Sequence, residues 1–555
     1  MDFFKKIDKN FLIFGGGAVV ILWQMLWPGY ILTLDMVFTP KMRFFLAGGD
    51  FYNTLPVNYF LKFLNLFLEG WIVEKIILFS LFFCLGYLAF KFLPVPDKYF
   101  SKYWAALFYT VNPFVYERIL AGHWRIILAY AFLPPFLHYL IKFGRERRGK
   151  DAFLIFLWLL IIGFSSLHFL VMAALVSGIY LIFIFLKNII SDKKKATALL
   201  KWSLIGGLIF FVISSYWLIP HLLNKSPSIV STFDNSHWQA FATASDARLG
   251  TTLNVLALYG FWGEGQPWAN YFLWPKDNFI FWSIVAVLLF FIIGAGIYSS
   301  LKNKESRFLG FGFLILSVSA FIFSCGLGQT IFRGLNLWLF ENIDFWAGFR
   351  DTQKFSAWLA LGYAYFGAIG LAAIMGYLEK IKFKFSKQIL IILFLIPIFY
   401  TYTMIGGFAR QLQPVWYPSD WFRVNDILNR DTSDFKVLFL PWHQYLSLDF
   451  NNNLITANPA KKFFDKPVIQ GENMEIGGIF SQAGGDENKE IEMLIFDKNK
   501  SSEEIIAELK ERGVKYIVNY EKLTENDYLK YKFLNSRNLK EVFGGSLKVF
   551  EIEAP

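Results

Sequence analysis

The sequence predicts a mainly α-helical, multi-pass membrane protein with an α/β domain at its C-terminal end. Composition is the first observation behind this prediction. The 555 residues are 55% hydrophobic and only 17% charged, whereas soluble domains carry about 25% charged residues. The second observation is a series of about eleven apolar stretches that predict transmembrane helices. The third is a change after about residue 408, where Asn, Asp, Glu and Lys become frequent. We therefore expect a transmembrane domain over residues 1–408 and an extracytoplasmic α/β domain over residues 409–555.

The apolar stretches predict spans because a helix needs about 20 apolar residues to cross the hydrocarbon core of a bilayer. The stretch 153–187 is too long for one crossing, and the polar break Ser165-Ser166-Leu167-His168 predicts a tight turn that divides it. The first stretch is long for a signal-peptide core and no Ala-x-Ala-like cleavage site follows it, so we expect a retained helix. The expected spans lie near 11–32, 71–93, 103–121, 124–143, 153–164, 168–187, 199–223, 278–300, 308–326, 355–377 and 388–407.

Positive charge predicts the orientation of these spans, because Lys and Arg accumulate in the short cytoplasmic loops of membrane proteins. With the N-terminus inside, the inner segments carry 23 Lys/Arg residues, and the outer segments carry 11 in roughly twice the length. The basic runs 144–150 and 193–195 are the clearest inner markers. Eleven crossings then leave the C-terminal domain on the outer side of the plasma membrane.

Three short runs of apolar residues and one helix signal predict the α/β fold of the C-terminal domain. The runs 437–440, 514–518 and 547–552 have the composition of strands. Between them, Ser501-Ser502-Glu503-Glu504 is typical of a capped helix start, and apolar residues continue at helical spacing to Gly513. About 145 residues are enough to bury a core of their own.

The distribution of charge argues against a nucleic-acid-binding protein. The net charge is +11, but residues 1–410 hold 36 Lys/Arg against 20 Asp/Glu, whereas residues 411–555 hold 18 against 23. The positive excess is therefore associated with the membrane, and no Lys/Arg-rich stripe with interleaved aromatic residues predicts a nucleic-acid groove. Both cysteines, Cys84 and Cys325, fall inside apolar spans, so neither a disulfide framework nor a cysteine metal cluster is expected.

Ionisable residues are scarce in the centres of the spans and gather at their outer ends. Transporters usually place such groups near the midplane, so this distribution favours a site at the outer membrane–water boundary. One reaction to consider at such a site is the transfer of a sugar from a phosphate carrier. Displacing the phosphate requires cations that hold it and a base that accepts the proton of the attacking hydroxyl. The charged residues at the outer ends are Asp35, Asp50, Glu117, Arg118, His123, Arg125, Asp246, Arg248, Glu264, Arg350, Asp351 and Lys354.

Asp35 is the candidate base, because it lies in the first outer loop just beyond the first span. The alternative is a loop acid that ends the first helix. Asp50 is a candidate second acid, since the preceding Gly48-Gly49 lets the backbone approach a ligand closely. The alternative for Asp50 is an ordinary Gly-Gly-Asp turn. The first loop contains no Asp-x-Asp motif, which favours transfer without a metal, and a divalent cation stays open as a cofactor.

The segment 112–125 is the densest polar cluster between two spans. Arg118 and Arg125 are candidates to bind a phosphate, with His123 as a hydrogen-bond donor. The alternative is an Arg/Trp interface anchor beside an ion pair between Glu117 and an arginine.

The segment 346–355 supplies two further candidate phosphate ligands, Arg350 and Lys354, at the mouth of a span. Four residues apart, they would share one face of a helix and offer two positive charges to one phosphate. The alternative pairs Arg350 with Asp351 and leaves Lys354 to extend toward the membrane surface.

Several of these motifs also carry a family resemblance. They are Leu32-Thr33-Leu34-Asp35 with Pro40, Asn112-Pro113-Phe114 with Pro134-Pro135, Phe349-Arg350 with Lys354-Phe355, and the C-terminal run 513–518. With them the chain resembles the GT-C glycosyltransferase superfamily, and more narrowly the membrane cores of mycobacterial AftD-type arabinofuranosyltransferases and YfhO-like membrane proteins. The resemblance implies a polyprenyl-phospho-sugar donor, an acid in the first outer loop, which Asp35 matches, and inverting transfer to a glycan, lipid or protein acceptor. The chain departs from the arabinosyl enzymes in having one acid in the Asp35 motif and no large carbohydrate-binding additions, so the sugar stays open.

Two other classes of protein stay open beside the transferase. A lipid or polysaccharide transporter would carry midplane charges or inverted repeats, and the sequence has neither. A non-catalytic membrane protein of envelope assembly would use the outer domain as a binding module, and it differs from the transferase chiefly in whether Asp35 acts as a base.

Overall fold

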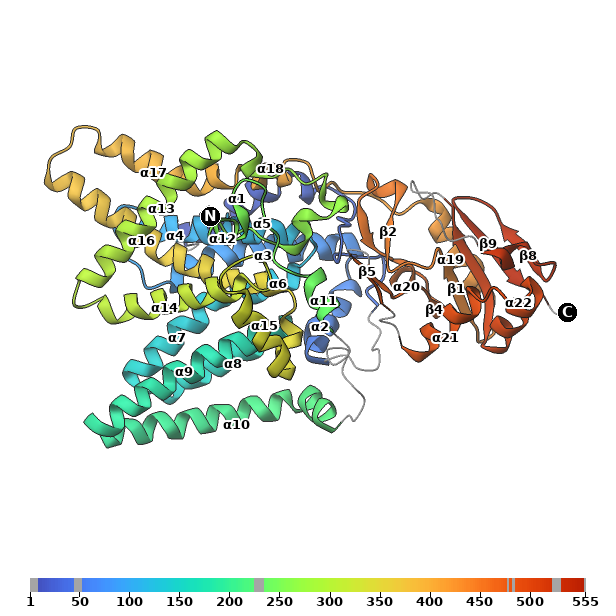
Figure 1. Ribbon diagram of the computed structural model, residues 1–555, viewed down its shortest axis with the longest axis horizontal. Helices are drawn as coiled ribbons and strands as arrows, with labels where there is room; N and C mark the ends of the chain where they lie inside the picture. The colour runs from blue at the N-terminus through green and yellow to red at the C-terminus, as the bar shows by residue number, and fades with distance from the viewer. Residues whose placement is uncertain are drawn as a thin grey trace, which may run out of the picture. The chain divides into compact units, whose positions relative to one another are not determined.

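The computed structural model describes residues 8–43, 52–223, 234–476, 479–481, 485–521 and 531–553. The chain divides into two compact units, whose elements are labelled in Figure 1. Unit 1 comprises Met1–Leu26, Phe51–Tyr59 and Ile76–Gln411. Unit 2 comprises Trp27–Asp50, Phe60–Lys75 and Leu412–Pro555. Unit 2 therefore combines the C-terminal region with two segments from the beginning of the chain.

The regular secondary structure in the described residues of unit 1 is helical. Helices α2 (Leu55–Asn65) and α3 (Gly70–Phe92) each have one end in unit 1 and the other in unit 2. The remaining helices of unit 1 are α1 (Lys9–Leu22), α4 (Ser101–Thr110), α5 (Pro113–Leu120), α6 (Trp124–Ala131), α7 (Leu133–Glu146), α8 (Gly149–Ser165), α9 (Leu167–Ser191), α10 (Lys193–Leu223), α11 (Asn235–Ala240), α12 (Gly250–Leu256), α13 (Phe279–Lys302), α14 (Arg307–Ser324), α15 (Arg333–Asn342), α16 (Ser356–Lys380), α17 (Ser386–Tyr400) and α18 (Ile405–Phe408).

The long apolar helices confirm the predicted class of multi-pass membrane protein. Among the described residues, eight helical segments are long and apolar enough to cross a membrane, or nine if the bent pair around Tyr400 forms one span. The predicted span 103–121 consists of the two short helices α4 and α5, which are separated by Val111 and Asn112. The number of about eleven crossings stays a prediction.

The predicted turn inside the stretch 153–187 lies where the sequence placed it. Helix α8 ends at Ser165 and α9 begins at Leu167. Asn112 likewise explains where α5 begins, because its side chain accepts a hydrogen bond from the backbone N–H of Val115 at 3.1 Å. Pro113 takes the first helical position, where no backbone N–H is needed. Helix α5 is important because it carries Glu117 and Arg118.

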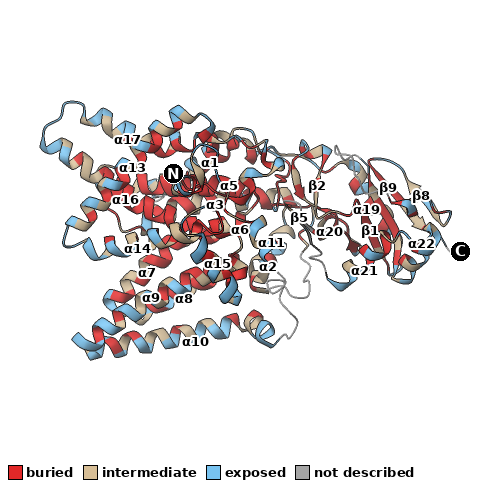
Figure 2. Cartoon of the chain, viewed as in Figure 1, coloured by how far each residue is buried: buried red, intermediate tan, exposed pale blue. Residues whose placement is uncertain are grey.

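Helix α16 lies inside unit 1, whereas α10 lies at its periphery (Figure 2). In the most apolar part of each helix, 78% of the residues are buried in α16 and 17% are buried in α10. Glycines allow other helices to approach α16 closely. A Cβ atom on Gly370 would lie 1.8 Å from the carbonyl oxygen of Ile292 in α13, and one on Gly367 would lie 2.0 Å from the ring of Trp104 in α4. Small residues at such contacts are typical of helix packing in membranes.

Unit 2 is built around a five-stranded sheet of order β4-β1-β7-β9-β8, which confirms the predicted α/β fold of the C-terminal region. The strands β4, β1 and β7 are parallel, and β9 and β8 extend the sheet in antiparallel fashion. Two small antiparallel pairs, β2 with β3 and β5 with β6, accompany it. The strands are β1 (Lys436–Leu440), β2 (Tyr445–Ser447), β3 (Ile455–Ala457), β4 (Val468–Ile469), β5 (Met474–Ile476), β6 (Ile479–Ser481), β7 (Val514–Tyr520), β8 (Leu539–Phe543) and β9 (Leu547–Ile552).

The helices of unit 2 cover this sheet and close its core. Ser501 caps α22 as the sequence predicted, because its side chain accepts from the N–H of Glu504 while the Glu504 carboxylate accepts from the N–H of Ser501. Buried side chains of α21 and α22 pack with those of β1 and β7. The helices are α19 (Ser419–Arg430), α20 (Ala460–Phe463), α21 (Asp486–Ile495) and α22 (Ser502–Glu511).

Candidate functional site

The candidate base Asp35 lies at the tip of a tight turn in unit 2. The turn is closed by two backbone hydrogen bonds between Thr33 and Met36, of 3.2 and 2.7 Å. Asp35 is exposed, whereas residues 31–34 and 36–39 on both sides of it are buried. Leu34 has a φ of 33°, which falls in the left-handed region that residues with a side chain seldom adopt. Such strain persists only where the surrounding structure holds it, and it often marks functional sites.

The C-terminal region holds this turn in place. The N–H of Leu34 donates to the carbonyl of Ile455 at 3.0 Å, and the N–H of Ala457 donates to the carbonyl of Leu34 at 2.7 Å. The turn thereby joins strand β3 as a short parallel neighbour. The hydroxyl of Tyr445 on β2 donates to Oδ1 of Asp35 at 2.7 Å. Asp35 is therefore part of the same unit as the α/β sheet, which the sequence did not predict.

A buried acid holds the chain just before the turn. The backbone N–H of Ile31 donates to Oε2 of Glu74 at 2.9 Å, and Lys75 lies 3.4 Å from the same oxygen. Glu74 is fully buried. Asn451 adds a side-chain hydrogen bond of 2.9 Å to the carbonyl of Leu32. The second candidate acid, Asp50, lies outside the described residues.

In unit 1, Arg118 is the centre of a buried polar cluster. Its guanidinium holds both carboxylate oxygens of Asp351, at 2.5 and 2.9 Å, and it donates from Nε to the Gln353 side chain at 3.1 Å. Gln353 in turn donates to Glu117 at 3.1 Å. Arg118, Glu117 and Gln353 are at most 1% exposed. The expected alternative, an ion pair between Glu117 and an arginine, is therefore replaced by a pair between Arg118 and Asp351, with Gln353 bridging to Glu117.

Two more predicted residues join this cluster. Nδ1 of His123 lies 3.1 Å from Nη1 of Arg118. The ammonium of Lys354 lies 3.7 Å from Asp351 and 3.5 Å from Nε2 of His168. Burial raises the pKa of Asp351, but the charges of Arg118 and Lys354 outweigh it and hold that pKa well below its usual range. One carboxylate is thus shared by two cations.

Arg350 and Arg125 take up other contacts. The Arg350 guanidinium lies 4.5 Å from the ring centre of Phe241. The Arg125 guanidinium lies 5.1 Å from the ring centre of Trp124 and bonds the side chain of Asn58. The alternative that pairs Arg350 with Asp351 stays a prediction.

The expectation that Arg350 and Lys354 share one face of an α-helix is wrong. Two short 3₁₀ helices, η8 (Asp344–Phe349) and η9 (Thr352–Phe355), occupy this segment, and α16 begins only at Ser356. The tighter turn of 3₁₀ helices changes which residues lie above one another. Lys354 therefore joins the cluster, whereas Arg350 packs on an aromatic ring.

A second buried network in unit 1 was not predicted. Lys276 donates to Glu264 at 2.5 Å and to Asn254 at 2.9 Å, and it lies 3.4 Å from Asp246. Burial lowers the pKa of Lys276, but the neighbouring carboxylates outweigh it and raise that pKa. Burial raises the pKa of Glu264, but Lys276 outweighs it, and the result is a pKa below the usual value. The sequence signal for Lys276 was weak, since it is one lysine in a long aromatic loop.

The cluster around Arg118 and the turn of Asp35 offer different chemistry. The cluster holds two cations, Arg118 and Lys354, and an arginine can hold a phosphate through two parallel hydrogen bonds. An exposed carboxylate on a rigid turn suits proton transfer. Among the described residues, no group of three or more His, Cys, Asp and Glu side chains has the arrangement of a metal site.

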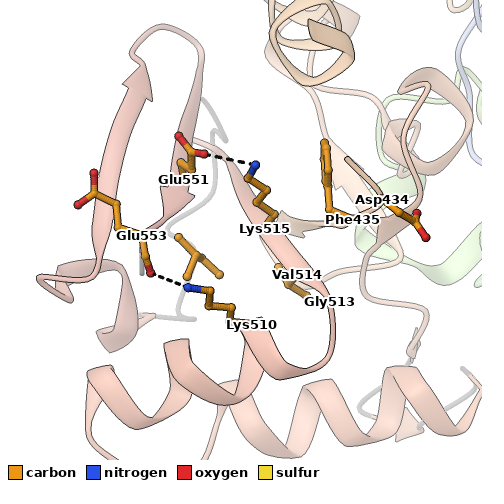
Figure 3. A pocket seen from close by; sticks show the side chains of 9 residues that line it. Asp434, Phe435, Lys510, Gly513, Val514, Lys515, Glu551 and Glu553 are labelled. Carbon is orange, nitrogen blue, oxygen red and sulfur yellow. Dashed lines mark hydrogen bonds and ion pairs between the residues drawn. The ribbon is translucent and has the colours of Figure 1, made fainter. Parts of the chain in front are cut away.

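A hollow of about 630 Å³ in unit 2 does not have the features of the candidate site (Figure 3). It lies where β1 and β7 begin, whereas open α/β sheets bind ligands at the carboxyl ends of their parallel strands. Two of the charged side chains that line it are already engaged. Lys515 bonds Asp431 at 2.5 Å and lies 3.7 Å from Glu551, and Lys510 donates to the carbonyl of Glu553 at 3.2 Å.

Comparison with known proteins identifies the fold. No family model and no curated protein matches the sequence. Among solved structures, arabinofuranosyltransferase AftD from Mycobacteria matches 99% of this chain with a TM-score of 0.63 and 13% sequence identity. A mutant of the same enzyme matches 99% of the chain with a TM-score of 0.62 and 12% identity. The chain spans 40% and 42% of the length of these proteins. This match confirms the predicted resemblance at the level of the fold: the chain has a membrane fold like that of AftD.

Proposed function

We propose that this protein is a membrane glycosyltransferase that moves a sugar from a polyprenyl-phosphate donor to an extracytoplasmic glycan, lipid or protein acceptor. The likeness in fold to AftD over 99% of the chain supports the class of enzyme. The observation that carries the proposal is the turn at Asp35, where one exposed carboxylate stands on a strained backbone between buried flanks. A loop acid that merely ends a helix needs neither that strain nor the hydrogen bond from Tyr445.

The proposed reaction is an inverting displacement at the anomeric carbon. The acceptor hydroxyl gives its proton to the Asp35 carboxylate, and its oxygen forms a bond to the anomeric carbon. On the opposite face of the sugar, the bond between that carbon and the phosphate oxygen breaks. Its electron pair leaves with the polyprenyl phosphate. No oxidant or reductant is needed, and the configuration at the anomeric carbon inverts.

The cations of unit 1 are the proposed ligands of the donor phosphate. Arg118 and Lys354 both pair with Asp351, and both are cations of the kind that stabilise the negative charge of a phosphate. His123 lies within hydrogen-bonding distance of Arg118 and is the proposed hydrogen-bond donor. Arg350 and Arg125 remain proposed ligands from the sequence pattern, each now seen against an aromatic ring.

The donor sugar is proposed from the structural neighbour alone. AftD is an arabinofuranosyltransferase, so a polyprenyl-phospho-arabinofuranose is the first donor to test. Other pentose and hexose donors belong in the same panel, because the chain spans less than half of that protein. We further propose that the protein lies in the plasma membrane with a cytoplasmic N-terminus and an outer C-terminal domain, as the positive-inside distribution predicts.

Native mass spectrometry of the purified protein tests the proposal most directly. We expect a retained polyprenyl-phospho-sugar, and we expect it to accumulate in Asp35→Asn because turnover stops while donor binding persists. The matched control is Asp449→Asn, since Asp449 is also an exposed acid of unit 2 that accepts a hydrogen bond from a tyrosine, Tyr520. Full transfer activity in Asp35→Asn would remove the assigned base. If no donor from the panel binds, a transporter or a non-catalytic envelope protein becomes the better description.

A further inference from the structure

Tyr445 contacts the carboxylate of Asp35 directly. The two residues are 410 positions apart in the chain, yet the phenol hydroxyl donates to Oδ1 of Asp35 at 2.7 Å. Both belong to unit 2, so the hydrogen bond is internal to one compact body. Resting on the proposed function, we propose that Tyr445 is the positioning residue of the base, through which the C-terminal region orients Asp35 and keeps it ready to accept a proton.

The strand register explains why a tyrosine is needed at this position. Leu34 pairs in parallel with Thr456 of β3, and continuing this pairing by one residue sets Asp35 beside Ala457. On the other side of β3, Ala457 pairs with Tyr445 of β2. Asp35, Ala457 and Tyr445 therefore lie in one line across three adjacent chains. The outer two are separated by two strand spacings, about 10 Å in all.

Only a long side chain with a terminal donor can bridge that separation. The hydroxyl of a tyrosine reaches across, whereas a serine or threonine hydroxyl is too close to its own backbone. Ala457 keeps the path open, since its side chain is a single methyl group between the phenol and the carboxylate. The line of three residues thus accounts for a small residue in the middle and a long donor at the far end.

The hydrogen bond has two consequences for a base. A donor to the charged form of a carboxylate stabilises that form and favours ionisation. Fixing one oxygen also sets the direction in which the carboxylate faces, and catalytic groups depend on such orientation. Two titratable groups near the hairpin have acidic partners. His443 lies 2.9 Å from Glu475, Lys461 lies 2.7 Å from Glu472, and β3 contributes no titratable side chain.

Carbodiimide labelling of Asp35 tests the inference without any substrate. The reagent reacts with protonated carboxyl groups, so the pH of half-maximal labelling, measured by peptide mass spectrometry on the full-length protein in nanodiscs, reports the ionisation of Asp35 itself. We expect Tyr445→Phe to move this pH upward by about 0.5–1 unit, the size expected for losing one hydrogen bond to an exposed charge. An unchanged pH of half-labelling in Tyr445→Phe would overturn the inference.

Two further variants make the test specific. Tyr520→Phe is the matched control, because Tyr520 donates to the carboxylate of Asp449 elsewhere in unit 2, and it should leave the labelling of Asp35 unchanged. Ala457→Leu should reproduce the effect of Tyr445→Phe, because a larger side chain blocks the path of the phenol. A normal labelling curve in Ala457→Leu would contradict the proposed line of contact.

The transfer assay separates this inference from the proposed function. With polyprenyl-phospho-arabinofuranose as the probe, Tyr445→Phe should lower kcat about tenfold, leave KM unchanged and move the acidic limb of the pH profile upward with the labelling curve. Inactive Asp35→Asn together with an unshifted Tyr445→Phe rejects the positioning role alone. If the labelling curve shifts in Tyr445→Phe but Asp35→Asn is fully active, Asp35 is not the base. Tyr445 then has no role in catalysis through Asp35.

Discussion

Replacing Asp351 by asparagine is the most informative test of the buried cluster in unit 1. The substitution keeps the size of the side chain and removes its charge. In the structure, Asp351 is 5% exposed and holds Arg118, which is 0% exposed, through two hydrogen bonds. Lys354 lies 3.7 Å away on the same carboxylate. Asp351→Asn therefore leaves two buried cations without their shared counter-charge.

The expected cost follows from the burial of this pair. Removing one partner of a buried ion pair costs about 3–5 kcal/mol, because the other charge stays desolvated and uncompensated. Removing the cation instead should cost less. In Arg118→Met, Asp351 keeps Lys354 as a partner, so we expect a smaller loss of stability than in Asp351→Asn. This asymmetry is specific to a site in which one carboxylate serves two cations.

Thermal unfolding of the full-length protein in nanodiscs, followed by tryptophan fluorescence, measures both variants. Asp97→Asn is the matched control, because Asp97 is 79% exposed and its ion pair with Lys102 lies at the surface. Such a pair contributes about 0–1 kcal/mol. If Asp351→Asn unfolds at the same temperature as Asp97→Asn, the reasoning about the buried pair is refuted.

The pH dependence provides an independent check on the same carboxylate. The pKa of Asp351 is lower in the folded protein than in the unfolded chain, where it is about 3.9. Its contribution to stability is therefore fully present above that value and is lost as the pH falls toward the folded pKa. The wild type should lose stability below about pH 4 through this group. The variant Asp351→Asn should lack that part of the acid sensitivity.

Four further predictions use other parts of the molecule. Asp35→Asn should abolish sugar transfer and leave the unfolding temperature nearly unchanged, and retained transfer would remove the central assignment. Arg350→Ala should weaken binding of the lipid donor by about 1.5–3 kcal/mol, as measured by titration of the donor, because a charge-assisted hydrogen bond to phosphate is lost. Glu264→Gln should make the unfolding temperature less dependent on pH below about pH 4–5. The pKa of Glu264 is lower in the folded protein than in the unfolded chain, so its carboxylate stabilises the folded protein above the unfolded pKa and this stabilisation is lost in acid. Gly370→Val should lower the unfolding temperature strongly because its Cβ has no room between α13 and α16, whereas Gly376→Val in the same helix meets nothing within 4 Å and should be tolerated.

The fold class was readable from the sequence because it depends on local composition and periodicity. Long apolar stretches require a bilayer, and the run 514–518 has the residues of a buried strand, which forms part of β7. The helix capped by Ser501 and the break at Ser165 were readable for the same reason, since caps and turns depend on a few adjacent residues. The segment 344–355 was not, because its 3₁₀ geometry accompanies contacts with distant parts of unit 1.

The partners of the candidate site residues were decided only by the tertiary structure. Arg118 and Asp351 are 233 positions apart, and Asp35 and Tyr445 are 410 apart. The sequence predicted an outer acid and outer cations, because their residue types and their places at the ends of the spans follow from charge and hydropathy alone. Which carboxylate neutralises which cation depends on how helices and strands pack, and no local pattern encodes that choice. By itself, the sequence therefore determined a membrane fold, and it predicted an acid in the first outer loop. The packing of unit 2 decided that this acid stands on a strained turn beside β3, within reach of Tyr445.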